Sequence, residues 1–310
     1  MALLRPILCG ILKNSALGDT ISSMEKTKAR AGKTGKDRNL RSLVLLLEDE
    51  EPSSASLVRE HILKIGAPIL PYLMDLERSR PALFEKAKGL ISDIVFGEIK
   101  KEFEKFARLS ESKKDLEKGA FLIARFAYPL LDERVYHKWL DNIAEKIKSD
   151  ISSSENSTTA FKRLHSFLSN AMGFRVNEEN YYDPDNNYLN RVIEMRRGTP
   201  LSLSILFLIL ARRLKIPAFG IGLPGHFVVG LGRPSLFWDP ILNKTLDVSG
   251  MRKRLAQNGF SYDPNALRPV SHSHILMRLL RNLMAVYQNA GLNLNSERLG
   301  ELAQILLIPQ

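Results

Sequence analysis

His226 and Asp239 lie thirteen residues apart in two segments with strand-like composition, and a strongly apolar helix is expected to begin before them at Pro200. A histidine on one strand can act as a general base, and an aspartate on the next strand can fix its tautomer. The start of a helix can hold a thiolate, because the helix dipole and the free N–H groups lower the pKa of a thiol. This combination is typical of nucleophilic catalysis, although a single histidine beside a Pro-Gly turn is more often structural.

Cysteine, which would supply the thiolate for such catalysis, is scarce in this chain. Its 310 residues include one cysteine, Cys9, which lies about 190 residues before Pro200. A single cysteine excludes an intrachain disulfide and a cysteine-rich zinc site. His272 and His274 form a His-x-His pair, but no further cysteine or histidine is close to them in sequence, so no metal site is predicted. Because neither a P-loop nor a dinucleotide-binding glycine motif is present, no cofactor is expected.

The elements that must position His226 and Asp239 can be read from the surrounding residues. Thr199 can cap a helix that begins at Pro200 and runs to about Leu214, and this helix is apolar nearly all round, so it should be buried. Three strand-like segments follow: AFGIGL (218–223), HFVVGL (226–231) and LFWDPIL (236–242). A buried helix followed by a short antiparallel sheet predicts an α+β fold for this part of the chain.

The rest of the chain is predicted to be helical. Apolar residues recur at i, i+3 and i+4 in Ala120–Tyr128 and Tyr136–Ile147, and a unit of about forty residues after Leu40 resembles a HEAT-type repeat. Four regions are expected: a basic flexible leader (1–39), a helical domain with the HEAT-like unit (40–172), the α+β core (173–270) and a C-terminal helical pair (271–310).

The formal net charge of +11 is concentrated in part in the leader, which carries eight Lys or Arg and three Asp or Glu. Such a segment can contact nucleic acid, although it is more often solvated. The Arg252–Arg254 cluster is expected on a solvated helix face. The apolar run Leu201–Ala211 is about half of the roughly 20 residues that a membrane-spanning helix needs, so no span is predicted. A cytoplasmic location is expected, and a single cysteine fits a reducing compartment.

The stretch YYDPDNNYLNRVIEMRRGTPLSLSILFLILARRLKIPAFGIGLPGHFVVGL, together with FWDPIL, resembles the transglutaminase-like core of the bacterial SirB invasion-regulator family. The resemblance extends over roughly residues 40–291 and implies a papain-like core preceded by helices, in a family whose activity is poorly defined.

Active transglutaminase-like proteins carry a Gly-x-Cys motif at the start of the core helix, about seventeen residues before a Gly-Ile-Pro-like turn. Here Gly198-Thr199-Pro200 stands at the motif, and Lys215-Ile216-Pro217 stands at the turn. The resemblance therefore places Pro200 where the nucleophile belongs. It places the matching histidine and aspartate at His226 and Asp239.

Three hypotheses follow. In the first, the protein is a non-catalytic binding or regulatory module whose pocket, with Gly198, Pro200 and Trp238, recognises a peptide or a protein partner. In the second, it is a hydrolase or acyltransferase in which Ser202 replaces the cysteine, with His226 as base and Asp239 as orienter. The purely structural interpretation of Ser202 is that its hydroxyl makes hydrogen bonds to backbone groups of the first helical turn. In the third, the basic leader makes the protein a nucleic-acid-associated regulator, although no recognition motif supports this.

Overall fold

The computed structural model describes residues 35–49, 51–150, 156–223, 225–232, 236–261, 263 and 267–307. Cys9 and most of the leader lie outside the described residues. The chain forms two compact units, which are considered separately below. The first comprises Met1–Glu102 with Arg125–Asp132, and the second comprises Phe103–Ala124 with Glu133–Gln310.

The described part of the first unit is helical. Its helices are α2 (Gly35–Leu45), α3 (Pro52–Ile65), α4 (Leu70–Ser79) and most of α5 (Pro81–Ala107). Pro52 and Pro81 are the first residues of α3 and α5, where a missing N–H leaves no helical hydrogen bond unmade. Gly66, with φ +69°, ends α3 in a conformation that favours glycine. The predicted helical region at this end of the chain is confirmed.

The second unit contains the remaining helices. They are α6 (Leu116–Ala124), α7 (Glu133–Asp150), α8 (Ser157–Ser166), α9 (Leu189–Met195), α10 (Pro200–Arg213), α11 (Val248–Gln257), α12 (His272–Asn289) and α13 (Asn293–Leu307). The helix predicted over Ala120–Tyr128 ends earlier, at Ala124. Pro129 accounts for part of this difference, because a proline disfavours helical geometry in the residue before it.

The second unit also contains a four-stranded antiparallel sheet. Its strands are β3 (Ala218–Leu223), β4 (His226–Leu231), β5 (Leu236–Asp239) and β6 (Lys244–Asp247), in the spatial order β3-β4-β5-β6. The first three strands begin where the sequence predicted them, and β5 ends before Pro240, which has no N–H for a ladder hydrogen bond. β6 was not predicted, because its pattern KTLD is short and half exposed.

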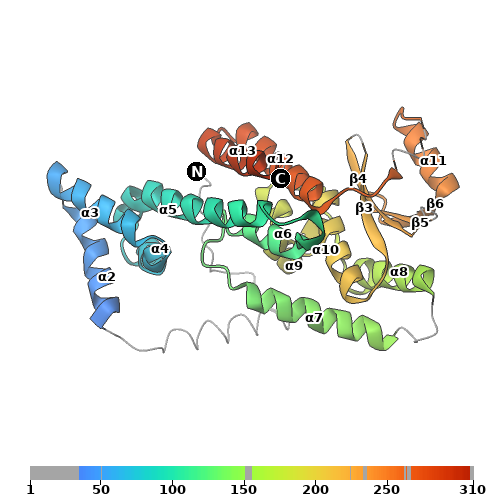
Figure 1. Ribbon diagram of the computed structural model, residues 1–310, viewed down its shortest axis with the longest axis horizontal. Helices are drawn as coiled ribbons and strands as arrows, with labels where there is room; N and C mark the ends of the chain where they lie inside the picture. Colours follow the sequence, from blue (N-terminus) through green and yellow to red (C-terminus); the bar gives the residue numbers. More distant parts are fainter. Residues whose placement is uncertain are drawn as a thin grey trace. The chain divides into compact units, whose positions relative to one another are not determined.

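The two faces of this sheet are covered by different helices (Figure 1). On one face, Val228 and Phe237 pack with Met251 and Leu255 of α11. On the other face, Trp238 stacks on Phe207 of α10, with ring centroids 4.8 Å apart. Helix α10 is buried nearly all round, as its composition predicted. The predicted α+β architecture, with helices before and after the sheet, is therefore confirmed.

A second, very small sheet positions the start of α10. β1 (Arg175–Val176) pairs in parallel with β2 (Arg197–Gly198), and Asn177 donates its backbone N–H to the carbonyl oxygen of Gly198 at 3.1 Å. Since β2 leads directly into the N-cap of α10, this pairing fixes the place where the core helix begins. Among the described helices, none combines the length and apolar character required to cross a membrane.

Candidate functional site

His226 and Asp239 lie together at one end of the β4–β5 pair. Val229 faces Trp238 in the strand register, so His226, three residues before Val229, and Asp239, one residue after Trp238, share this end. The Nε2 atom of His226 lies 3.1 Å from Oδ1 of Asp239. The Asp239 side chain is fully buried, and that of His226 is 14% exposed. The structure thus brings together the two residues that the sequence singled out.

Three further donors surround the Asp239 carboxylate. The backbone N–H groups of Ile241 and Leu242 donate to Oδ1 at 2.9 and 3.3 Å, and Arg254 Nε donates to Oδ2 at 3.1 Å. Burial by itself would raise the pKa of Asp239, but the His226 ring, the Leu242 N–H and the Arg254 guanidinium favour the charged form. The net effect is a pKa below the usual aspartate value.

Arg254 was expected on a solvated face, and this expectation is wrong. Its side chain is only 19% exposed, because it reaches from α11 to the end of β5. The signal in the sequence was the spacing of Met251 and Leu255, both buried, which places Arg254 next to the apolar face of the helix.

The ring of His226 approaches Asp239 without forming a hydrogen bond. Although Nε2 lies within ion-pair distance of Asp239, neither Nε2 nor Nδ1 makes a hydrogen bond to any described residue. The backbone of His226 is held firmly instead: Arg278 of α12 donates to the carbonyl oxygens of His226 and Leu223, at 2.7 and 2.8 Å. A fixed main chain thus carries a buried imidazole without a hydrogen-bond partner, which is uncommon for a buried polar group.

The start of α10 holds proline and serine in a closed arrangement. Pro200 is the first helical residue and is buried, and Thr199 and Ser202 form a reciprocal capping box. The Ser202 hydroxyl is 2.6 Å from the carbonyl oxygen of Asn186, to which it donates, and it accepts from the Thr199 N–H at 2.9 Å. A Cβ on Gly198 would lie 2.6 Å from that hydroxyl oxygen, so glycine is required there.

Two other polar groups near these elements lack hydrogen-bond partners among the described residues. They are Nδ2 of Asn187, whose Oδ1 accepts from the Thr199 hydroxyl at 3.4 Å, and Nε1 of Trp238. Trp238, expected to line the pocket, is packed between Phe207 and His165. Asn187 was not singled out by sequence analysis. Its only signal was its place in the polar stretch DPDNN just before α9.

A second buried carboxylate, that of Glu117 in α6, lies elsewhere in this unit. Arg213 of α10 donates to both of its oxygens, at 2.6 and 2.8 Å, and Nδ1 of His137 in α7 lies 2.5 Å from Oε1. Arg213 also donates from Nε to Asp141 at 2.8 Å. This Glu117 cluster was not foreseen, because its members lie 20 to 96 residues apart in the chain.

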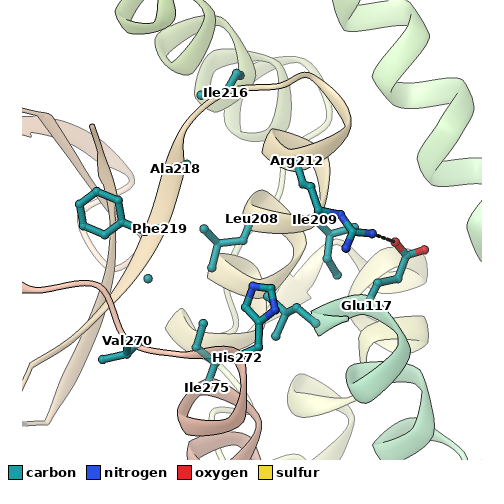
Figure 2. Close-up of a pocket in the computed structure, with 12 residues that line it drawn as sticks. Glu117, Leu208, Ile209, Arg212, Ile216, Ala218, Phe219, Val270, His272 and Ile275 are labelled. Carbon is teal, nitrogen blue, oxygen red and sulfur yellow. Dashed lines mark ion pairs between the residues drawn. The ribbon is translucent and has the colours of Figure 1, made fainter. Parts of the chain in front are cut away.

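A cavity of about 190 Å³ adjoins the Glu117 cluster (Figure 2). Its walls are mainly apolar side chains of α10, β3 and α12, with the ring of His272 beside Leu208 and Ile209. Arg212 turns toward Glu117, and their charged atoms are 3.9 Å apart. Nδ1 of His272 is 2.7 Å from the carbonyl oxygen of Lys114, so this histidine is held by the backbone.

A larger cavity, of about 280 Å³, lies at the turn that follows Asp239, although neither Asp239 nor His226 lines it. It is lined by residues of β1, β2 and the turn after β5: Arg175, Val176, Asn177, Glu178, Glu179, Arg197, Pro240, Ile241 and Asn243. Within the part of the chain that the structure describes, no three His, Cys, Asp or Glu side chains come together in a way that could hold a metal ion.

Comparison with known proteins identifies the core of this unit. Residues 134–281 match the family model described as the transglutaminase-like superfamily. This match confirms the transglutaminase-like core that the sequence predicted. No solved structure matches the chain.

Several curated proteins are similar to part of the chain. A UPF0162 protein of Xylella fastidiosa is 37% identical over 179 residues, which cover 55% of this chain and 64% of that protein. A UPF0162 protein of Pseudomonas aeruginosa is 30% identical over 159 residues, covering 49% and 57%. The human F-box only protein 21 is 25% identical over 205 residues, covering 56% and 33%. The chain thus spans less than two thirds of the length of these relatives.

Proposed function

We propose that the transglutaminase-like core is a binding module, which recognises a peptide or protein segment at the His226–Asp239 site and does not catalyse a reaction on it. The observation that carries this proposal is the start of α10. Pro200 takes the place that the family resemblance gives to the nucleophile, and proline has no nucleophilic side-chain atom.

The buried, unpartnered nitrogens of His226 support a role in binding. A protein that only needed this histidine for stability would satisfy its ring nitrogens, since an unmade hydrogen bond in a buried place costs about 1–3 kcal/mol. A ligand carrying a hydroxyl, amide or carboxylate could supply the missing partner. The orphan amide of Asn187, whose side chain contacts the N-cap residue of α10, offers a second such donor.

The alternative is a hydrolase or acyltransferase with Ser202 as nucleophile. The contacts of Ser202 favour the binding module over this alternative, because its hydroxyl proton is already donated to Asn186 and its oxygen already accepts from Thr199. A serine nucleophile must instead give its proton to the base. The side chain is also buried, at 1% exposure.

The proposal also includes a family assignment and a cellular location. We assign the chain to the SirB-like branch of the transglutaminase-like proteins on the long motif around α10, and we place it in the cytoplasm on its single cysteine. A nucleic-acid role of the basic leader is the weaker regulatory candidate, since no recognition motif in the sequence supports it.

The experiment that tests the proposal is labelling with a fluorophosphonate, which reacts with activated serines. Wild type, Ser202→Ala and Ser204→Ala are compared. Ser204 is the matched control, since it is equally buried on the same helix and donates its hydroxyl to the Pro200 carbonyl oxygen at 2.8 Å.

We expect no labelling above that of the heat-denatured protein in any of the three. Labelling of wild type and of Ser204→Ala that disappears in Ser202→Ala would overturn the proposal and establish the hydrolase. Thermal melting of each variant shows whether a loss of signal reflects unfolding.

A further inference from the structure

The cavity of about 280 Å³ shares a wall with the His226–Asp239 site. Ile241 lines this cavity, and its backbone N–H donates at 2.9 Å to the same Asp239 oxygen that lies 3.1 Å from His226. Arg197, which precedes Pro200 by three residues in the chain, also lines the cavity. A ligand in this cavity would therefore contact the turn whose backbone N–H binds the buried carboxylate, and the strand that leads into the core helix.

Two arginines stand next to each other in the cavity. Arg175 and Arg197 are register partners on the parallel strands β1 and β2, so their side chains leave the sheet on the same face. Like charges at adjacent positions of a sheet are destabilising unless something offsets them. The pKa of Arg197 lies below its ordinary value. Burial of the guanidinium is the larger cause, and repulsion by the charge of Arg175 is the second.

Neither arginine is neutralised by an ion pair with a described residue. Arg197 donates to the carbonyl oxygens of Gly173 and Arg196, at 3.1 and 2.9 Å, which fixes the guanidinium without removing its charge. Arg175 makes no ion pair or hydrogen bond through its side chain to the described residues, and it is exposed. Glu178 and Glu179 also line the cavity, and Glu179 lies near enough to act on Arg197, yet both are exposed and neither is in ion-pair contact with an arginine.

The turn that forms the other wall is apolar and exposed. Ile241, which lines the cavity, is 41% exposed, and its neighbour Leu242, outside the lining, is 40% exposed, although both follow a buried strand. Exposed apolar side chains that border a charged cavity are a feature of surfaces that bind protein segments. Arginine is also the residue best suited to hold a carboxylate through two parallel hydrogen bonds.

We propose that the Arg175–Arg197 pair is an anion subsite, and that the occupant of this cavity is an acidic peptide segment of a partner protein, with an apolar side chain against Ile241 and Leu242. This proposal rests on the proposed function, because it names the class of ligand for that same site. The net charge of +11 adds a long-range attraction toward acidic partners.

The test uses the full-length protein and two fluorescent, terminally blocked heptapeptides, one with a central Glu-Leu-Glu and one with a central Gln-Leu-Gln. Fluorescence anisotropy at low salt measures their Kd for wild type, Arg175→Gln and Glu178→Gln. Arg281→Gln is the matched control, since Arg281 is exposed on α12 and its replacement removes the same charge. A ten-residue oligothymidylate serves as a nucleic-acid probe.

We expect the acidic peptide to bind about tenfold or more tightly than its glutamine counterpart, as charge-assisted hydrogen bonds to arginine imply. Arg175→Gln should weaken this binding about fivefold or more, Glu178→Gln should strengthen it, and Arg281→Gln should change it less than twofold.

The proposal is overturned if the two peptides bind equally or not at all, or if Arg281→Gln weakens binding as much as Arg175→Gln. It is also overturned if only the oligonucleotide shows a dependence on Arg175. These outcomes leave the non-catalytic binding module standing, since that is decided by serine labelling. Because Arg175 is exposed, its variant should fold, and its circular dichroism spectrum verifies this.

Discussion

Asp239 and Glu117 are both buried carboxylates, and each lies between a histidine and an arginine. At Glu117, Arg213 makes two hydrogen bonds and His137 approaches to 2.5 Å. At Asp239, Arg254 makes one hydrogen bond, and His226 lies 3.1 Å away without making one. The carboxylate is matched by donors in both places, since Asp239 also accepts from the backbone N–H groups of Ile241 and Leu242, and only the His226 ring is left without a hydrogen bond.

This difference in hydrogen bonding distinguishes a structural cluster from a candidate binding site. The Glu117 cluster joins α6, α7 and α10, and the carboxylate is matched by donors, so it has no need of a ligand. At the Asp239 site the imidazole keeps two nitrogens without a hydrogen bond, and the turn that follows Asp239 lines a cavity of about 280 Å³. Burial and residue type are shared by the two places, and only the completeness of the hydrogen bonding separates them.

The largest expected effect of a single substitution is at the Glu117 cluster. Glu117→Ala should lower the free energy of unfolding of the second unit by about 3–5 kcal/mol, because it leaves the Arg213 guanidinium buried with one partner fewer. Urea denaturation followed by circular dichroism measures this. Glu145→Ala is the control, since Glu145 pairs with Lys148 while 74% exposed, and such pairs contribute at most about 1 kcal/mol. Equal losses in both variants would contradict a structural role of the cluster.

The second prediction concerns the Asp239 site and the position of the start of α10 relative to His226. In a Cys9→Ser background, the thiol of Pro200→Cys should react with iodoacetamide at about pH 6 at the same rate with and without His226→Ala, because the strand register turns His226 and Asp239 toward α11, whereas Trp238 stacks on α10. Mass spectrometry follows the alkylation.

Ser204→Cys in the same background is the control for this experiment. Its thiol would lie on the same helix but one turn further on, at a fully buried position, and should show no dependence on His226. A reaction of Pro200→Cys that is tenfold or more faster in the presence of His226 would show that the two residues lie together and would contradict this arrangement.

The third prediction compares the two histidines directly. His137→Leu should lower the free energy of unfolding by about 1 kcal/mol, since a hydrogen bond to a charged carboxylate is lost from a half-exposed ring. His226→Leu should lower it by less, because the removal of nitrogens without hydrogen bonds offsets the loss of the contact with Asp239. Thermal and urea unfolding of both variants tests this order, and a larger loss at His226 would contradict it.

The sequence predicted the elements of the core closely, for reasons that are local. Continuous apolar runs bounded by proline and glycine set the limits of β3 and β4, and Thr199-Pro200 set the start of α10. The pairing of His226 with Asp239 could be predicted because both sit on neighbouring strands of a short meander.

What the sequence did not predict depends on contacts between distant segments. Arg254 reaches Asp239 across fifteen residues, and Ser202 donates to the carbonyl oxygen of a residue sixteen positions earlier. The members of the Glu117 cluster come from three helices. No periodicity encodes such partners, and they decide which polar residues are satisfied. The roles assigned to Ser202, His226 and Asp239 in the site therefore stay predictions.

The smallest expected effect is a dependence of stability on pH that belongs to Asp239. Its pKa in the folded protein lies below the ordinary aspartate value, so the unfolded chain binds more protons in acid. The stabilisation by the carboxylate is therefore complete above the unfolded pKa, and it is lost as the pH falls through the folded pKa.

Asp239→Asn cannot titrate at this position. The difference in free energy of unfolding between wild type and this variant should be constant above about pH 5 and should shrink below about pH 4. Urea denaturation across this range measures it, and a difference that persisted unchanged to about pH 3 would mean that the folded protein does not favour the charged form of Asp239.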